Sequence, residues 1–238
     1  MDADRIKKLP DAIDRLQPPH QPRVLIVTSV DAEKDAVLRG LHAAGAGSDT
    51  FVVLTVGVGT AAAAVGTARA LASAKYDLVI NAGICGGFAG QAEIGTLVVA
   101  SEIIAADLGA ETADGFIGLD ELGFGSSRAA VDKDLAARAA EAFRHAGLPV
   151  AMGPILTVST VTGTAASAAE LAVRVPGAAA EGMEGYGAAV AAHEFGLRVL
   201  EIRSVSNAVG PRDKSAWRIK DALQALEAAS QALTEVFA

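Results

Sequence analysis

The stretch "EGMEGYGAAVAAHEFGLRVLEIRSVSNAVG", residues 181–210, decides the fold class. A carboxylate, Glu184, opens a predicted helix of small residues over 184–195, and a hydrophobic strand that ends in Ser206 and Asn207 follows it. Sheets of α/β proteins bind ligands outside the carboxyl ends of their strands, so Glu184 and Asn207 are predicted to face one pocket. The alternative is that Glu184 only complements the helix dipole and that Asn207 is a turn residue.

On both sides of this stretch, hydrophobic strands alternate with amphipathic helices. The predicted strands cover residues 23–29, 51–56, 77–83, 96–107, 153–160 and 198–206, and the predicted helices cover 31–44, 60–74, 131–146, 164–173, 184–195 and 215–236. We expect a single α/β domain with a mixed, twisted β-sheet flanked by helices, because 96–107 is typical of longer, partly antiparallel strands.

Residues 1–22 end in "QPPHQP", whose prolines cannot continue a helix. They are predicted to form an N-terminal extension and linker, and the domain to cover residues 23–238.

The composition of the 238 residues limits the partners. A net charge of -8 argues against nucleic acid and against anionic membranes. No apolar run is long enough to span a bilayer, and the charged N-terminus does not resemble a secretory signal. Cys85 is the single cysteine, which excludes an intrachain disulfide and favours a reducing, cytoplasmic location. We therefore expect a small-molecule partner, no nucleic acid and no membrane.

Neither a metal nor a cofactor is expected. Gly57, Gly59 and Ala62 in "VGVGTAA" have the spacing of a dinucleotide-binding fingerprint, but that motif normally follows the first strand and needs an acid after the next one. We interpret the glycines as a tight turn that lets the backbone approach a ligand or a helix. The four histidines are scattered and form no pair at metal-ligand spacing.

Two further segments carry candidate site residues. Glu33 follows the first strand, where a carboxylate can act as a general base, although first-turn acids also simply complement the helix dipole. The glycine-rich "NAGICGGFAG", residues 81–90, follows the third strand and is either a ligand wall or a plain connection. Within it, Cys85 is interpreted as a packing residue, since no histidine is near in sequence to activate it.

The ordered set "VTSVDAE", "TVGVGTAAAA", "LVINAGICGG", "EGMEG" and "EIRSVSNAVG" resembles the nucleoside phosphorylase and nucleosidase superfamily over nearly the whole chain after Arg23. The pieces "DLGAE", "LGFG" and "SNAVGPRD" resemble a branch of hydrolases from menaquinone biosynthesis. The resemblance implies an N-glycosidase that cleaves a purine nucleoside without a cofactor. It also implies a homo-oligomer, a dimer or larger, in which the segment over 107–125 is our candidate for the contact.

The resemblance assigns catalytic roles residue by residue. Glu33 matches the glutamate that activates water, and Met183 with Glu184 matches the pair that holds the ribose. Asn207 stands where adenine-specific relatives carry an aspartic acid. An amide offers N–H donors to the N7 and O6 acceptors of a 6-oxopurine, so hypoxanthine is the expected leaving base.

Further substrate contacts follow from the same resemblance. They are Ile84, Cys85, Gly86, Val161, Thr162, Ser206 and, against an aromatic 5′ substituent, Trp217. A carboxylate on that substituent implies a basic partner, for which Arg212 and Lys214 are both candidates.

Three alternatives stay open. One is a purine nucleoside phosphorylase, for which Arg69 and Arg203 are the arginines to consider as phosphate ligands. The second is a methylthioadenosine/adenosylhomocysteine nucleosidase on the same fold. The third is a purine-binding protein without catalytic activity.

Overall fold

The computed structural model describes residues 22–237, so the predicted extension lies, except for Pro22, outside the described residues. The strands of the main sheet are β1 (Val24–Thr28), β2 (Phe51–Thr55), β3 (Leu78–Gly87), β4 (Leu97–Ala105), β7 (Arg128–Ala130), β8 (Val150–Thr157), β9 (Ala180–Gly182) and β10 (Arg198–Ala208). The main helices are α2 (Asp31–Ala43), α3 (Thr60–Ser73), α5 (Lys133–His145), α6 (Ala165–Arg174), α7 (Gly185–Glu194) and α8 (Ile219–Leu233). Each predicted helix and strand is present, with ends shifted by a few residues.

The main sheet is mixed, as predicted, and part of it closes on itself. Strands β2, β1, β3 and β10 are parallel neighbours, whereas β4 is antiparallel to β10 and β9 is antiparallel to β3. Strand β8 lies between β4 and β9 and is parallel to both. The pairings β3, β10, β4, β8, β9 and back to β3 therefore form a ring.

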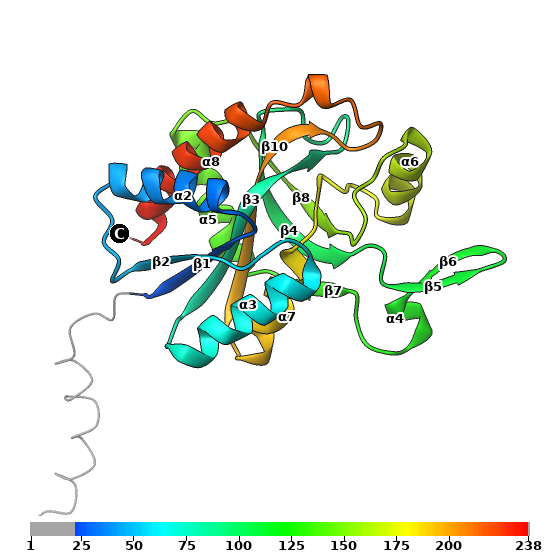
Figure 1. Ribbon diagram of the computed structural model, residues 1–238, viewed down its shortest axis with the longest axis horizontal. Coiled ribbons are helices and arrows are strands. Elements are labelled where there is room, and N and C mark those ends of the chain that lie inside the picture. The colour runs from blue at the N-terminus through cyan, green and yellow to red at the C-terminus, as the bar shows by residue number, and fades with distance from the viewer. Residues whose placement is uncertain (1–21, 238) are drawn as a thin grey trace, which may run out of the picture.

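Helices cover both faces of this sheet. Along β1 the buried side chains alternate: Val24 and Ile26 pack in the core under α2, α5 and α8, whereas Leu25 and Val27 pack in the core under α3 and α7. Figure 1 shows these two helical layers on opposite sides of the strands. Strands buried on both faces explain why their sequences are almost continuously apolar.

Several short elements were not predicted. A hairpin of β5 (Gly109–Thr112) and β6 (Gly115–Gly118), followed by α4 (Leu119–Leu122), projects from the body of the molecule (Figure 1). Strands β7 and β9 have three residues each, too few to produce a periodic pattern. Strand β3 continues to Gly87 rather than ending at Gly83, so the glycine-rich segment is part of the sheet and not a plain connection.

The chain end also differs from the prediction. The expected helix over 215–236 is a 3-10 turn, Lys214–Ala216, followed by α8 from Ile219 to Leu233 and a second 3-10 turn, Thr234–Phe237. Trp217 lies between the first turn and α8 rather than in a helix.

Close packing of α3 against α7 positions the start of α7. A Cβ atom at Gly187 would lie 2.1 Å from the main-chain oxygen of Thr60, so only glycine allows this approach. The hydroxyl of Thr60 in turn donates to the main-chain oxygen of Met183, at 3.1 Å. Within residues 22–237, no helix combines the length and the apolar character that crossing a membrane requires.

Candidate active site

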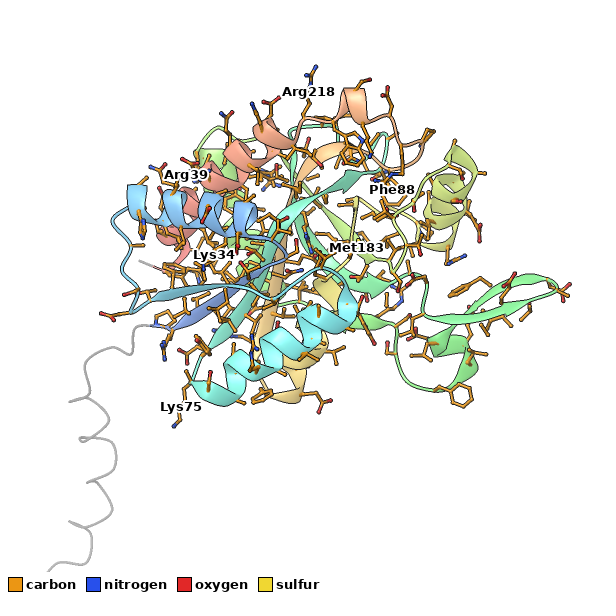
Figure 2. The ribbon with its side chains drawn as sticks, viewed as in Figure 1. Lys34, Arg39, Lys75, Phe88, Met183 and Arg218 are labelled. Atoms are coloured by element: carbon orange, nitrogen blue, oxygen red, sulfur yellow. The ribbon has the colours of Figure 1, made fainter. Side chains whose placement is uncertain are left out.

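A cavity of about 290 Å³ lies where β1, β3 and β10 end and α7 begins. Every residue predicted for the site lines it: Glu33, Ile84, Cys85, Gly86, Val161, Thr162, Met183, Glu184, Ser206, Asn207 and Trp217. Met183 lies near the middle of the molecule (Figure 2). The volume is close to the lower end of the range, about 300–1,000 Å³, for small-molecule sites.

Glu33 is a buried carboxylate held by main-chain donors. Its Oε2 accepts hydrogen bonds from the Ser29 N–H at 2.9 Å and the Ser29 hydroxyl at 2.6 Å, and its Oε1 accepts from the Ile84 N–H at 2.8 Å. The side chain is 2% exposed. A Cβ atom at Gly83 would lie 2.6 Å from Oε1, so the glycine of β3 makes room for this carboxylate. The arrangement fixes an acceptor oxygen at the cavity wall.

Glu184 immediately precedes α7, as predicted, and is bound from three directions. Its Oε1 accepts from the Gly59 N–H at 3.1 Å, and its Oε2 accepts from the Met183 N–H at 3.3 Å and from Arg203 Nη2 at 3.1 Å. Gly59 has a φ of 91°, in the region that favours glycine. The "VGVGTAA" turn therefore brings a backbone donor to Glu184, in agreement with its interpretation as a close-approach turn.

Arg203, a candidate phosphate ligand in the sequence, has a guanidinium that is buried among carboxylates. Arg203 Nε donates to Glu201 Oε1 at 2.8 Å, and Asn81 Nδ2 donates to the same oxygen at 3.1 Å. Burial alone lowers the pKa of Arg203, but Glu201, Glu184 and Glu33 outweigh it and hold the pKa above its usual range. The cation therefore stays charged and compensates the acidic residues around the cavity.

Asn207 and Ser206 both face the cavity because β10 contains a bulge between Val205 and Asn207. The Ser206 hydroxyl lies 2.8 Å from Asn207 Oδ1, and Asn207 Nδ2 donates to the Ala208 main-chain oxygen at 2.9 Å. Since the amide nitrogen carries two hydrogens, one N–H of Asn207 remains for a ligand. The sequence predicts donors to both N7 and O6, and the contact with Ala208 leaves one of the two.

Trp217 and the exposed Arg212 lie at the mouth of the cavity, where Val58 and Ile219 are also exposed. Arg212 Cζ lies 5.3 Å from the centre of the Trp217 ring, within the range of a cation–π contact. Both side chains line the cavity, whereas Lys214 lies in an adjoining hollow with them. Of the two basic candidates, Arg212 is thus the one on the cavity itself.

Cys85 has the packing environment expected of it. The residue is 5% exposed, and burial raises the pKa of its thiol far above the usual value. A neutral thiol is a poor nucleophile.

Glu181 was not predicted as a site residue, although it lines the cavity and is 4% exposed. Burial raises the pKa of its carboxyl group, against the lowering by hydrogen bonds from Thr162. Glu181 precedes Glu184 in "EGMEG", separated from it by Gly182 and Met183. A second carboxylate in so apolar a segment is the signal that could have identified it as a site residue.

The arginines required of a phosphorylase are not free in this cavity. Arg203 is engaged by Glu184 and Glu201, and Arg69 lies exposed on α3, outside the cavity lining. Among residues 22–237, no three His, Cys, Asp or Glu side chains are grouped to hold a metal ion.

The fold and the cavity place the protein in a known class: the profile of the phosphorylase superfamily matches residues 26–238. The chain is 50% identical to the futalosine hydrolase of Streptomyces coelicolor over 219 residues, which cover 85% of this chain and 91% of that protein. The chain therefore belongs to the phosphorylase superfamily and, within it, to the futalosine hydrolase family.

Two further proteins resemble this chain at lower sequence identity. The 5′-methylthioadenosine/S-adenosylhomocysteine nucleosidase of Maridesulfovibrio salexigens is 30% identical over 67% of this chain and 69% of its own. The solved structure of futalosine hydrolase from Helicobacter pylori has a TM-score of 0.77 and 16% identity, covering 90% of this chain and 98% of its own. At that identity the structure confirms the fold alone.

Proposed function

We propose that the protein is an N-glycosidase that hydrolyses futalosine to hypoxanthine and dehypoxanthine futalosine, a step of menaquinone biosynthesis. The observation that carries the proposal is the convergence of Glu33, Glu184 and Asn207 on one cavity of a chain that is 50% identical to a futalosine hydrolase. Water is the proposed nucleophile, because the arginines considered for phosphate are ion-paired or outside the cavity.

Glu33 is the proposed general base. Its carboxylate takes a proton from water, whose oxygen forms a bond to C1′ of the ribosyl group as the bond from C1′ to N9 of the base breaks. The bonding electrons leave with the base, which regains a proton from solvent at a ring nitrogen. Four N–H and O–H donors, from Ser29, Val30 and Ile84, already fix the carboxylate, so it needs no reorganisation to meet the water. A positioned base contributes a factor of about 10² to 10⁴ in rate.

Glu184, with Met183, is the proposed ribose-binding group. Positive charge develops on the ribosyl ring as the glycosidic bond breaks, and a nearby carboxylate stabilises that charge more in the transition state than in the ground state. Arg203 and the Gly59 N–H hold the carboxylate in place from the side of the protein. The ribose hydroxyls are the expected donors to its remaining lone pairs.

Asn207 is the proposed partner of the leaving base. Negative charge spreads over the purine as C1′ departs, and an N–H donor near N7 stabilises it electrostatically. An amide does not release a proton at neutral pH, so Asn207 assists by hydrogen bonding rather than as an acid. Ser206, at 2.8 Å from Asn207 Oδ1, orients the amide with its nitrogen toward the base.

The 5′ substituent of bound futalosine is expected to extend out of the cavity along Trp217, and the aromatic ring of the substituent is expected to stack against the Trp217 ring. Beyond Trp217 the wall becomes basic: Arg212, Lys214, Arg218 and Lys220 surround an adjoining hollow with Asp221 as its acidic residue. In Figure 2, Arg218 extends from the outer rim of the molecule. This excess of positive charge suits the carboxylate that ends the futalosine tail, with Arg212 as its nearest partner.

Chromatographic detection of the released base tests the proposal. Purified protein is incubated with futalosine, inosine and methylthioadenosine, each with and without phosphate. Release of hypoxanthine from futalosine at the same rate with and without phosphate is expected. Phosphate-dependent cleavage of inosine would instead assign a phosphorylase, adenine release would assign the methylthioadenosine branch, and no release from any substrate would favour a binding protein.

We further propose a homo-oligomer in the cytoplasm. The segment over 107–125 projects from the body, and it carries Phe124, which is 80% exposed. An exposed aromatic residue on a projecting segment is typical of an interface. Light scattering on wild type and Phe124→Asp is expected to give a dimer or larger for the first and smaller particles for the second. The cytoplasmic location is supported by the single cysteine, which leaves no disulfide to form.

A further inference from the structure

Glu181 is a buried carboxylate in the cavity wall to which the hydrolysis described above gives no role. Its Oε1 accepts a hydrogen bond from the Thr162 N–H at 2.9 Å, and its Oε2 accepts from the Thr162 hydroxyl. Removing a carboxylate from water is costly, so a carboxylate with room for further donors at a binding cavity requires an explanation. Each of its oxygens has a lone pair beyond the bond to Thr162.

The strand register relates Glu181 directly to Asn207. Gly86 of β3 is paired with Glu181 on β9 and, on its other side, with Asn207 on β10. Directly opposed residues of neighbouring strands project from the same face of a sheet, and all three residues line the cavity. Glu181 and Asn207 therefore flank a position that has no side chain of its own.

The two strands that carry Glu181 and Asn207 lie far enough apart for one base to reach both side chains. Neighbouring strands lie about 4.8 Å apart, so two strand spacings separate the backbones of Glu181 and Asn207 by about 10 Å. A purine above the sheet, with a hydrogen bond of about 2.9 Å at each end, can therefore meet side chains that rise from these two strands. A Cβ atom at Gly86 would lie 3.5 Å from Asn207 Nδ2 and 2.9 Å from Val209 Cγ2, so only glycine leaves the Asn207 amide and the Val209 side chain where they are.

The two ends of this space have opposite hydrogen-bonding character. On the Glu181 side, the main-chain N–H of Thr162 already donates to the Glu181 carboxylate and is not available to a ligand. The cavity wall there presents carboxylate oxygens, which accept hydrogen bonds. On the other side, Asn207 offers an N–H. A 6-oxopurine carries a donor at N1–H and acceptors at N7 and O6, whereas a 6-aminopurine carries an acceptor at N1 and a donor on its amino group.

We propose that Glu181 is a specificity-determining residue that accepts the N1 proton of a 6-oxopurine base while Asn207 donates to its N7 or O6 edge. This inference rests on the proposed function, because it assigns the base end of the same cavity. A 6-aminopurine would set its N1 lone pair against the carboxylate and leave buried groups unpaired, which disfavours it.

The test is a comparison of futalosine with its 6-amino analogue in wild type and Glu181→Gln. Glutamine keeps the shape of the side chain and can still accept from the Thr162 N–H. The preference for futalosine, as the ratio of the two kcat/KM values, is expected to fall by about 10- to 100-fold, the effect of one hydrogen bond to a charged group. Glu170→Gln, at an exposed carboxylate of α6 outside the cavity lining, is the control and is expected to keep both turnover and the preference.

Equal losses on both substrates in Glu181→Gln, with the control unchanged, would assign Glu181 a structural role and overturn the inference. That result leaves the proposed function intact, since wild type would still release hypoxanthine. A wild type that cleaves no futalosine would overturn the proposed function instead.

A binding measurement covers the case in which Glu181→Gln fails to fold. Calorimetry on wild type is expected to show that hypoxanthine binds at least about 10-fold more tightly than 1-methylhypoxanthine, which lacks the N1 proton. Equal affinities would overturn the inference, whether or not the protein turns over futalosine.

Discussion

Arg203 and Glu184 form a buried ion pair at the cavity wall, with Nη2 and Oε2 3.1 Å apart and side-chain exposures of 1% and 5%. The pair links the centre of β10 to the start of α7, two elements that are consecutive in the chain. The Arg203 guanidinium is itself held by Glu201 and does not line the cavity. The Glu184 carboxylate, which is proposed to face the ribose, is therefore fixed from behind the cavity wall.

The first prediction concerns the stability of this network. Arg203→Met leaves Glu184 and Glu201 buried without their cation, so the free energy of unfolding is expected to fall by about 3–5 kcal/mol. Urea denaturation measures it. Arg198→Ala, on the same strand, removes a guanidinium that is 59% exposed and paired with Asp132, and is expected to cost about 0–1 kcal/mol. Equal stabilities for the two variants would contradict the role assigned to Arg203.

The second prediction concerns the base. Glu33→Gln keeps the shape of the side chain but removes its basicity, so kcat on futalosine is expected to fall by about 10²- to 10⁴-fold. Asp35→Asn lies on the same helix but is exposed, and is expected to keep wild-type activity. Circular dichroism establishes that both variants are folded. Retained activity in Glu33→Gln would move the general base elsewhere.

The third prediction concerns the substrate tail. Arg212→Gln removes the cation at the cavity mouth, so KM for futalosine is expected to rise by about 10-fold, whereas the rate on a nucleoside without a carboxylate, such as inosine, stays unchanged. Arg218→Gln, in the adjoining hollow but not on the cavity, is the matched control with a smaller effect. Parallel changes on both substrates would indicate that Arg212 acts on folding rather than on the tail.

The fourth prediction concerns Cys85. Burial raises the pKa of its thiol, so the reactive thiolate is scarce at neutral pH, and iodoacetamide is expected to leave the native protein unmodified. Mass spectrometry after treatment reports the labelling, and the same protein in urea is expected to react fully. Rapid labelling of the native protein would show that the site opens.

The fifth prediction concerns the contact between α3 and α7. Gly187→Ala places a Cβ atom against the Thr60 carbonyl, so the helices must move apart, at a cost of about 1–3 kcal/mol in stability. Val65→Ala, at a position of α3 that is 68% exposed, is expected to change stability by no more than about 0.5 kcal/mol. Thermal unfolding of both variants checks this, and an unchanged melting temperature for Gly187→Ala would refute the close packing.

Much of the fold was predictable because its strands are buried on both faces. The apolar run "VLIV" in "RVLIVTS" directly precedes an amphipathic helix, and such runs specify strands without any knowledge of tertiary contacts. Glu33 and Asn207 could be selected because they follow such runs, where the ends of parallel strands meet.

The parts that escaped prediction depend on contacts between distant segments. Strand β9 has three residues, so the position of Glu181 opposite Gly86 is set by pairing and not by a local pattern. The ion pair of Glu201 and Arg203 is indicated by the sequence itself. The two residues alternate with apolar residues inside "RVLEIRSVS", so their side chains project from the same face of the strand. Charged residues in a strand that is otherwise apolar indicate an internal ion pair.

The extra residue in β10 has a consequence for protein engineering. In a regular strand, Ser206 and Asn207 would project from opposite faces, whereas the bulge turns both into the cavity. Deleting Ser206 would restore the regular alternation and shorten the chain by one residue between Val205 and Asn207. The direction of the side chain at position 207 thus depends on the length of the strand as well as on its sequence. A residue transferred to this position from a relative would contact the base in the same way only if the relative's strand has the same bulge.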